Sequence, residues 1–586
     1  MGGGKAAWLA LALLSALALG VRLVGLDFLL PGLLEPDNNV ALQAELIERG
    51  ERHPEADWRY GSYPLLVARC AEALPRRAAM PASGAGLEEH LRAASGSILR
   101  ARLAVALLSV LIVPGTFFLA RRFLGPGWSL FAAAVMAASL LDTSFAQQAR
   151  PHAPLASMTL LALLAALRLR RAPTPVAYVV AGLAVGAAVG TLHNGLAVLP
   201  ALAVAWLLRR RERGRASGAW ILATLAIVAV LAWRLYPTLF ASLGRASGGG
   251  ELDLAQRRLA HGEHEIFLVD FDGSGLRLTP EALWLYEPIA LLLAGLGLAR
   301  AVLALARGAR AERERAHDLA VLLAFALPYL AVLGAFARTL ERFTLPLLPL
   351  LACLAAYGAA GAAELAARAL PAGRARRVAV PAVAMALLAF PAAATVKLAL
   401  ARSRPTTLAE AARFVREHAT TAERVLVTPG LDLPLFSGAG ALRSNRELFR
   451  DPQSYPRITN WFRHQVRALD QGLELDPAEP RWQLLWIPPR PLESGGEAAV
   501  AEYLESFDGD WLALEVFGPD RGQPFMDALR SAAASLGRRV ARFEPEPSSQ
   551  ALFAYEDIGF PPRWHGAVRT LRIERTGPVI ELYRLP

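Results

Sequence analysis

The chain has 586 residues, of which 54% are hydrophobic and 19% are charged, and it carries a net charge of +11. This apolar balance excludes an ordinary soluble enzyme of the same length and predicts a polytopic α-helical membrane protein. The positive charge does not indicate a nucleic-acid partner, because the arginines gather in short segments between apolar runs, where they set membrane topology. The two cysteines, Cys70 and Cys353, lack metal-thiolate spacing, and we expect no structural disulfide.

Apolar runs recur along the first 400 residues. A crossing needs about 20 apolar residues, so these runs predict about eleven transmembrane helices. The runs at 153–167 and 195–208 are shorter, and we expect neighbouring helices or a cavity to shelter them. No small-residue cleavage motif follows the first run, which favours a retained anchor over a signal peptide. The runs lie near residues 6–26, 101–119, 127–146, 153–167, 175–192, 195–208, 218–236, 282–306, 317–337, 343–367 and 378–400.

Basic clusters in every second loop predict the orientation of the chain. If the N-terminus is cytoplasmic, they all fall on the side of Lys5, which places the segments 27–100, 237–281 and 401–586 outside the cytoplasm. We therefore predict a transmembrane domain at 1–400, with outer loops at 27–100 and 237–281. Residues 401–586 alternate between helical and strand patterns, which predicts an extracytoplasmic α/β domain with strands that include 551–556 and 579–585. The abundance of alanine, arginine and leucine is typical of a bacterial source.

Five motifs, taken in order, resemble a known family. The chain is similar to the GT-C membrane glycosyltransferases, and especially to the protein O-mannosyltransferases and the lipid A aminoarabinose transferase. The resemblance implies a GT-C fold in the bacterial inner membrane. It also implies transfer of a sugar from a polyprenyl-phosphate donor to a protein, lipid or glycan acceptor at the outer face. The motifs are "EPDNN" (35–39), "ARPHAPLASMTLLAL" (149–163), "ERFTLPLLPLLACLAA" (341–356), "TLAEAARFVREHATTAERVLV" (407–427) and "TGPVIELYRL" (576–585).

Asp37 matches the catalytic aspartate of that family, so the resemblance implies that it is the general base. Such a reaction needs one base for the acceptor hydroxyl, whereas the departing phosphate needs only cationic or hydrogen-bonding stabilisation. Without the resemblance, Asp37 would be taken as a helix cap, and the two roles are compatible. Many relatives carry a Glu where this chain has Asn38. An amide binds a metal without supplying charge, so a divalent metal cofactor stays open, with Glu35 as a substitute ligand.

Four cationic or imidazole side chains are candidate contacts for the donor phosphate. Arg150 and His152 open the second motif; His152 stands where relatives often carry an aspartate, and Arg150 is alternatively an interfacial anchor. His193 stands where relatives usually carry a lysine, and a buried, hydrogen-bonded histidine explains it equally well. Arg342 lies in a short outer loop against the charge rule, which favours a contact with lipid phosphate. Tyr63, in a short outer helix expected at 62–74, completes the substrate contacts with Glu35 and Asn38.

The segment "HGEHEIFLVDFDG" (261–273) is a weaker candidate for a metal site. On a helix, His261 and His264 would share one face and take a metal, but a solvated polar loop explains the same residues. No Walker or Rossmann glycine loop occurs.

Two other functions are open. A transporter or flippase of a lipid-linked glycan would favour charged residues within the spans and similar halves; the apolar runs are nearly free of charge, and no internal repeat is seen. A non-catalytic GT-C-like binding or assembly subunit is consistent with Asn38 and His152.

Overall fold

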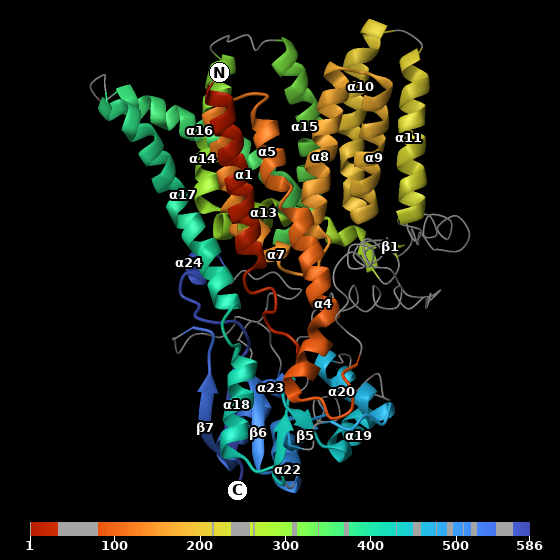
Figure 1. Cartoon of the computed structure of the whole chain (residues 1–586), viewed down its shortest axis with the longest axis vertical. Coiled ribbons are helices and arrows are strands. Elements are labelled where there is room, and N and C mark those ends of the chain that lie inside the picture. The colour runs from red at the N-terminus through yellow and green to blue at the C-terminus, as the bar shows by residue number, and fades with distance from the viewer. Residues whose placement is uncertain are drawn as a thin grey trace.

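The computed structural model places a bundle of long helices over an α/β layer, with the N-terminus at the end of the bundle remote from the sheet (Figure 1). It describes residues 2–32, 80–213, 216–235, 258–261, 264–306, 313–337, 339–368, 374–428, 431–448, 459–475, 478–488, 496–507, 509–516, 524–546 and 566–586. Glu35, Asp37, Asn38 and Tyr63 lie outside these residues.

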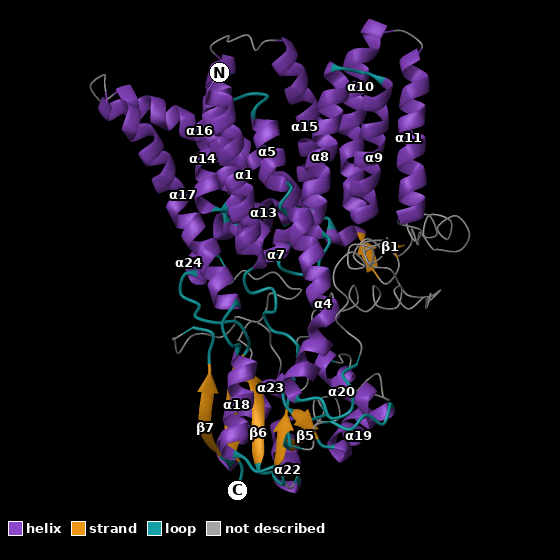
Figure 2. Cartoon of the chain, viewed as in Figure 1, coloured by secondary structure: helices purple, strands orange, loops and turns teal. Residues whose placement is uncertain are grey.

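Every predicted apolar run is helical in the structure (Figure 2). Among the described residues, seven helices are long and apolar enough to cross a membrane, or up to nine if each of two bent pairs counts as one span. A multi-pass helical membrane protein is therefore confirmed, whereas eleven crossings stay a prediction. The bundle contains α1 (Gly2–Leu23), α4 (Leu87–Ser109), α5 (Ile112–Ala120), α6 (Pro126–Ala137), α7 (Leu140–Ala146), α8 (His152–Arg171), α9 (Pro175–Thr191), η1 (His193–Val198), α10 (Leu199–Arg213), α11 (Ala216–Leu235), α13 (Gly275–Tyr286), α14 (Pro288–Ala306), α15 (Arg313–Ala335), η3 (Glu341–Leu347), α16 (Leu348–Arg368) and α17 (Arg374–Arg402).

Small residues allow several of these helices to approach closely. Gly182, Gly186 and Gly190 recur every four residues on α9, and a Cβ at Gly186 would lie 2.6 Å from Leu231 Cδ1 of α11. This spacing is typical of membrane helices, which associate through close packing rather than through the hydrophobic effect. The shelter predicted for α8 is confirmed, because most of this helix is buried inside the bundle.

Helix α4 begins well before its predicted apolar run. Its first turns, from Leu87, pack against Phe436 and Trp461 of the α/β layer rather than against lipid. A hydropathy window centred on the membrane misses such turns because they contain residues such as Glu88, Glu89 and His90. Helix α4 therefore joins the two layers (Figure 1).

The α/β layer contains a mixed six-stranded sheet of order β4-β5-β3-β6-β8-β7. Strand β3 pairs in parallel with β5 and β6, and β4 pairs in parallel with β5, while β8 runs antiparallel to both β6 and β7. The predicted strands near 424 and 579–585 are present, while 551–556 lie outside the described residues. The elements are α18 (Thr407–His418), β3 (Arg424–Val427), β4 (Phe436–Ser437), α19 (Ala439–Leu448), α20 (Asn460–Asp470), β5 (Arg481–Trp486), α22 (Gly496–Ser506), β6 (Trp511–Val516), α23 (Pro524–Leu536), β7 (Arg538–Phe543), α24 (Ala567–Thr570) and β8 (Val579–Arg584).

The alternation predicted for 401–586 is therefore observed, although β4, α19, β7 and α24 were not predicted. The separateness of this segment as a domain stays a prediction. Its core is shared with the N-terminal part of the chain, because Phe28 and Leu29 pack among Leu408, Val425 and other residues of the layer.

Gly297 and Gly295 of α14 offer a matched test of helix packing. A Cβ at Gly297 would lie 2.2 Å from Leu354 O of α16, whereas nothing lies within 4 Å of a Cβ at Gly295. We expect Gly297→Ala to lower the free energy of unfolding by about 1–3 kcal/mol through overpacking. Gly295→Ala should be neutral or slightly stabilising, because alanine favours a helix. Thermal unfolding in detergent measures both variants, and equal midpoints would contradict the close approach of α14 and α16.

Candidate functional site

The turn that follows α1 is held by polar side chains from three other segments. Arg102 Nη1 of α4 donates to Leu26 O at 2.7 Å and to Phe28 O at 2.9 Å. Gln147 Nε2 donates to Val24 O at 2.6 Å, and Gln147 Oε1 accepts from Arg402 Nη1 of α17 at 2.7 Å. The guanidinium carbons of Arg102 and Arg402 each lie 4.1 Å from the centre of the Phe28 ring. The described residues of this turn reach Gly32, five residues before Asp37 in the chain.

An ion pair anchors the same turn to the bundle. Arg22, near the end of α1, donates to the Asp142 carboxylate of α7, and neither side chain is exposed. Gly25 has φ +74°, and a Cβ there would lie 2.7 Å from the Arg402 backbone carbon, so only glycine fits without strain. The turn that precedes the predicted catalytic loop is thus held to the bundle by buried contacts of Arg22, Gly25 and Phe28.

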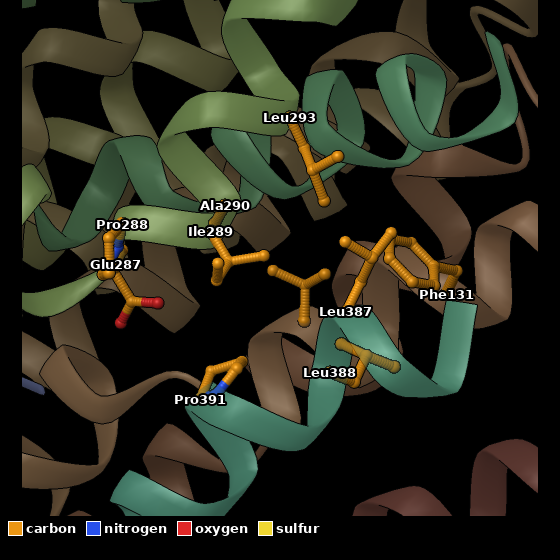
Figure 3. A pocket seen from close by; sticks show the side chains of 10 residues that line it. Phe131, Glu287, Pro288, Ile289, Ala290, Leu293, Leu387, Leu388 and Pro391 are labelled. Carbon is orange, nitrogen blue, oxygen red and sulfur yellow. The ribbon is translucent and has the colours of Figure 1, made fainter. Parts of the chain in front are cut away.

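Glu287 lies where two pairs of consecutive helices bend. Helices α6 and α7 meet at a bend of 51°, and α13 and α14 meet at a bend of 118° beside Glu287. The buried Glu287 carboxylate accepts from Ser139 Oγ at 2.6 Å and from Leu141 N at 3.0 Å, so it satisfies donors at the start of α7. Glu287 also lines a small recess of about 10 Å³, whose other side chains are apolar (Figure 3). They belong to α6, α14 and α17 and include Phe131, Leu293, Leu387, Leu388 and Pro391.

The structure brings four predicted site residues together. His152 lies at the first position of α8, and Arg342, Arg150 and His193 lie near enough to act electrostatically on its imidazole. Arg150 and His152 are buried, Arg342 is half-buried and His193 is exposed, so this cationic cluster reaches from the bundle interior to its surface. The Phe343 ring centre lies 5.9 Å from that of His152.

Hydrogen bonds link the segments that carry this cationic cluster. Tyr329 of α15 donates to Phe343 O at 2.9 Å and is hydrogen-bonded to the Asn194 side chain. The cluster therefore joins the start of α8 to η1 and η3, which run on into α10 and α16. The N-terminus of a helix carries a partial positive charge. The arrangement is suited to an anion, and chiefly to a phosphate.

His261 and His264 do not share a helical face, and that expectation was wrong. They lie opposite each other in an antiparallel pair formed by β1 (Arg258–His261) and β2 (His264–Phe267), which the 3₁₀ turn η2 (Leu268–Asp270) follows. Strand pairing across this hairpin overrides the helical spacing. Over the described part of the chain, no group of three or more His, Cys, Asp or Glu is arranged to hold a metal ion.

The apolar runs of the bundle also contain buried charges, contrary to the expectation that they are nearly free of charge. Arg22, Asp142 and Glu287 lie inside predicted apolar runs and are fully buried. A lone ionisable residue within an apolar run could have revealed these buried charges in the sequence, because each charge buried in a bundle requires a partner. Scarcity of charge is therefore no argument against a transporter, whereas the lack of an internal repeat still is.

One segment of the chain matches a known family. Residues 91–236 match the family model described as dolichyl-phosphate-mannose-protein mannosyltransferase. This segment spans less than half of the chain, from α4 to α11, and contains Arg150, His152 and His193 but neither Asp37 nor Arg342. The predicted resemblance is confirmed over these residues. No curated protein matches the sequence.

Three solved structures are similar to the chain at low identity. ArnT from Cupriavidus metallidurans in the apo state has 15% identity and a TM-score of 0.44, covering 99% of this chain and 98% of that one. The oligosaccharyltransferase AglB from Archaeoglobus fulgidus, in complex with an inhibitory peptide and a dolichol-phosphate, has 12% identity and a TM-score of 0.43, covering 91% and 72%. The arabinofuranosyltransferase AftD from Mycobacteria has 18% identity and a TM-score of 0.37, covering 98% and 40%.

Asp432 offers a pH test of the contact between the two layers. Its backbone oxygen faces Gly32, and its carboxylate accepts from Phe462 N at 3.1 Å and from Thr459 Oγ1. Burial outweighs these hydrogen bonds and raises the pKa of Asp432 to about 7. The folded chain then holds this proton more tightly than the unfolded chain, whose aspartate pKa is about 3.9. The contribution of Asp432 to stability is therefore full below the unfolded-state pKa of about 3.9. It is lost as pH rises from there to about 7, with a slope of at most about 1.4 kcal/mol per pH unit.

We expect Asp432→Asn to remove this contribution, so that its stability exceeds that of the wild type increasingly as pH rises. The difference in thermal midpoint between the two proteins, measured from acid to neutral pH, isolates Asp432 from other titrating groups. Asp470→Asn serves as a control, because Asp470 is half-exposed and pairs with Arg446 at the surface. A wild type and an Asp432→Asn variant with parallel pH profiles would show that Asp432 titrates normally.

Proposed function

We propose that the chain is a membrane glycosyltransferase that moves a sugar from a polyprenyl-phosphate donor to an acceptor hydroxyl, with Asp37 as the general base. The observation that carries the proposal is the cationic cluster of Arg150, His152, His193 and Arg342 at one end of the bundle. Three of these residues lie in the segment that matches a family described by a donor of this class, a sugar on dolichyl phosphate.

The cationic cluster would serve the leaving group. As the bond from the anomeric carbon to the phosphate oxygen breaks, negative charge grows on a polyprenyl phosphate that has a low pKa and needs no proton. Guanidinium groups fixed in a buried site stabilise this charge without reorganisation at the moment of reaction. The half-buried Arg342 and the exposed His193 would meet the phosphate first, and the buried Arg150 would set the potential from within.

A lipid-linked donor fits a site in a bundle of helices long and apolar enough to cross a membrane. A donor whose tail stays in the bilayer keeps its sugar at the interface, so the site has to be built there. We place the site on the extracytoplasmic side of a bacterial inner membrane, with the N-terminus inside and the α/β layer outside.

The base would come from the loop that follows the anchored turn. Asp37 takes the proton of the acceptor hydroxyl, whose oxygen attacks the anomeric carbon on the face opposite the phosphate, so the sugar is transferred with inversion. Glu35, Asn38 and Tyr63 would contact the sugar, and Glu35 and Asn38 are the ligands available if a divalent metal takes part. The tight anchoring of residues 24–32 would give this loop a fixed starting point.

Replacement of the base tests the reaction itself. We expect Asp37→Asn to lower kcat for sugar transfer by about 10²–10⁴-fold, because a positioned general base contributes this much. Membrane vesicles given a radiolabelled polyprenyl-phosphate sugar and an extract of acceptors provide the assay. Asp27→Asn is the matched control, because Asp27 is an exposed acid in the anchored turn. Undiminished transfer by Asp37→Asn would overturn the role of this residue, and movement of lipid-linked sugar without transfer would favour the transporter.

Binding of the lipid phosphate tests the cationic cluster without the reaction. We expect Arg342→Gln to weaken binding of sugar-free polyprenyl phosphate by about tenfold or more, because a charge-assisted hydrogen bond is lost. Titration of the purified protein in detergent measures the dissociation constant. Arg277→Gln changes an exposed arginine of α13 and should leave it unchanged. Equal affinities of the Arg342→Gln and wild-type proteins would remove Arg342 from the site.

A further inference from the structure

The edge strand of the sheet contains an irregularity that changes the direction of its side chains. Strand β7 pairs with β8 antiparallel, and the register shifts between Arg539 and Ala541. In a regular strand, residues three apart point to opposite faces. The extra residue, Val540, puts Arg539 and Arg542 on the same face, opposite Tyr583 and Glu581 respectively.

These two arginines meet a third on the same carboxylate. Glu581 Oε1 accepts from Arg539 Nη1 at 2.9 Å and from Arg542 Nη1 at 2.5 Å. Arg530 of α23, which covers this face, donates to both oxygens at 2.9 and 3.0 Å. The Tyr583 hydroxyl donates to Oε2 at 2.9 Å. One fully buried carboxylate thus orients three guanidinium groups from two elements.

The resulting triad of Arg530, Arg539 and Arg542 is richer in charge and donors than the carboxylate requires. Burial opposes ionisation of Glu581, but the bonds from Arg530 and Tyr583 outweigh it and hold the pKa of this carboxyl below its usual range. Even with Glu544, which pairs with Arg542, three positive charges face two negative ones. Arg530 Nη1, Arg539 Nε and Nη2, and Arg542 Nη2 donate to no acceptor among the residues that the structure describes.

Two of the three arginines are well exposed, and Arg542 is 19% exposed. The side chains of Arg530 and Arg539 are 40% and 49% exposed, whereas Glu581 is fully buried beneath them. Charged side chains and a bulge also protect an edge strand from pairing with another chain, and separated arginines would do this as well. Gathering three guanidinium groups around one carboxylate creates repulsion that edge protection does not need. An oxyanion with several acceptor oxygens would relieve that repulsion.

We propose that Arg530, Arg539 and Arg542 form a binding site for a phosphate group, with Glu581 as the positioning residue beneath it. The ligand class is a tetrahedral oxyanion, either free phosphate or the phosphate of a monoester on a larger ligand. The site lies on the α/β layer, apart from the cationic cluster of the bundle, and it does not depend on the proposed transferase function.

Titration of the full-length protein in detergent with inorganic phosphate, at constant ionic strength in chloride, tests the site. We expect saturable binding that Arg539→Gln weakens by about tenfold and that Arg530→Gln combined with Arg539→Gln abolishes. Arg446→Gln is the matched control, because Arg446 is 48% exposed in the same layer and pairs with a single acid, Asp470. It should bind phosphate like the wild type.

The same titration with glucose 1-phosphate distinguishes the two sources. Binding as tight as that of inorganic phosphate assigns the site to a phosphomonoester, and binding of inorganic phosphate alone assigns it to the free ion. Thermal midpoints without phosphate establish that the variants fold. If the double variant does not fold, the affinity of Arg539→Gln for phosphate tests the site by itself. The proposal is overturned if wild-type protein shows no saturable binding, or if Arg539→Gln binds phosphate as tightly as Arg446→Gln.

Discussion

Anchoring of the turn at residues 24–32 is the constraint on which the rest of the structure depends. The end of a helix leaves carbonyl groups without intrahelical partners, and here they lie in a region that buried side chains fill. Arg102, Gln147 and Arg402 reach this turn from α4, from the α7–α8 connection and from α17. The guanidinium groups of Arg102 and Arg402 also lie over the Phe28 ring. Four segments distant in sequence are thereby fixed at one point, and the predicted catalytic loop leaves from it.

This junction also makes the bundle and the α/β layer interdependent. Phe28 and Leu29 complete the core of the layer, and the first turns of α4 lie against α20, where His90 Nδ1 is 3.1 Å from His464 Nε2. Burial and the nearby charges of His90 and Arg467 lower the pKa of His464 to about 4, so at neutral pH one neutral ring donates to the other. The contact between His90 and His464 therefore joins the first turns of α4 to the layer.

Charge inside the bundle is paired or hydrogen-bonded at three places where a helix ends or breaks. Arg22 pairs with Asp142 at the end of α1, and Glu287 accepts from Ser139 and Leu141 at the bends of α6–α7 and α13–α14. At the end remote from the sheet, Arg170 of α8 pairs with Asp318 and Glu314 of α15. Lipid provides no hydrogen bonds, so irregular backbone is stable only where protein groups replace water. The breaks bring the starts of α8, η1 and η3 together, and the cationic cluster forms there.

The sequence by itself determined the helical bundle, because apolar runs of membrane length have few alternatives once water is excluded. It also determined most of the α/β elements of the tail, whose periodicity is local. It named Arg150, His152 and Arg342 one by one from their place in motifs, and His193 from the position where relatives usually carry a lysine. That these four residues share one site was decided only by the tertiary structure, because their proximity arises from contacts among α8, η1 and η3. The same holds for Glu287, whose partners lie almost 150 positions away, and for Arg539 and Arg542, which a single extra residue turns to one face. Local pattern sets which elements form, whereas long-range packing and register set which side chains meet.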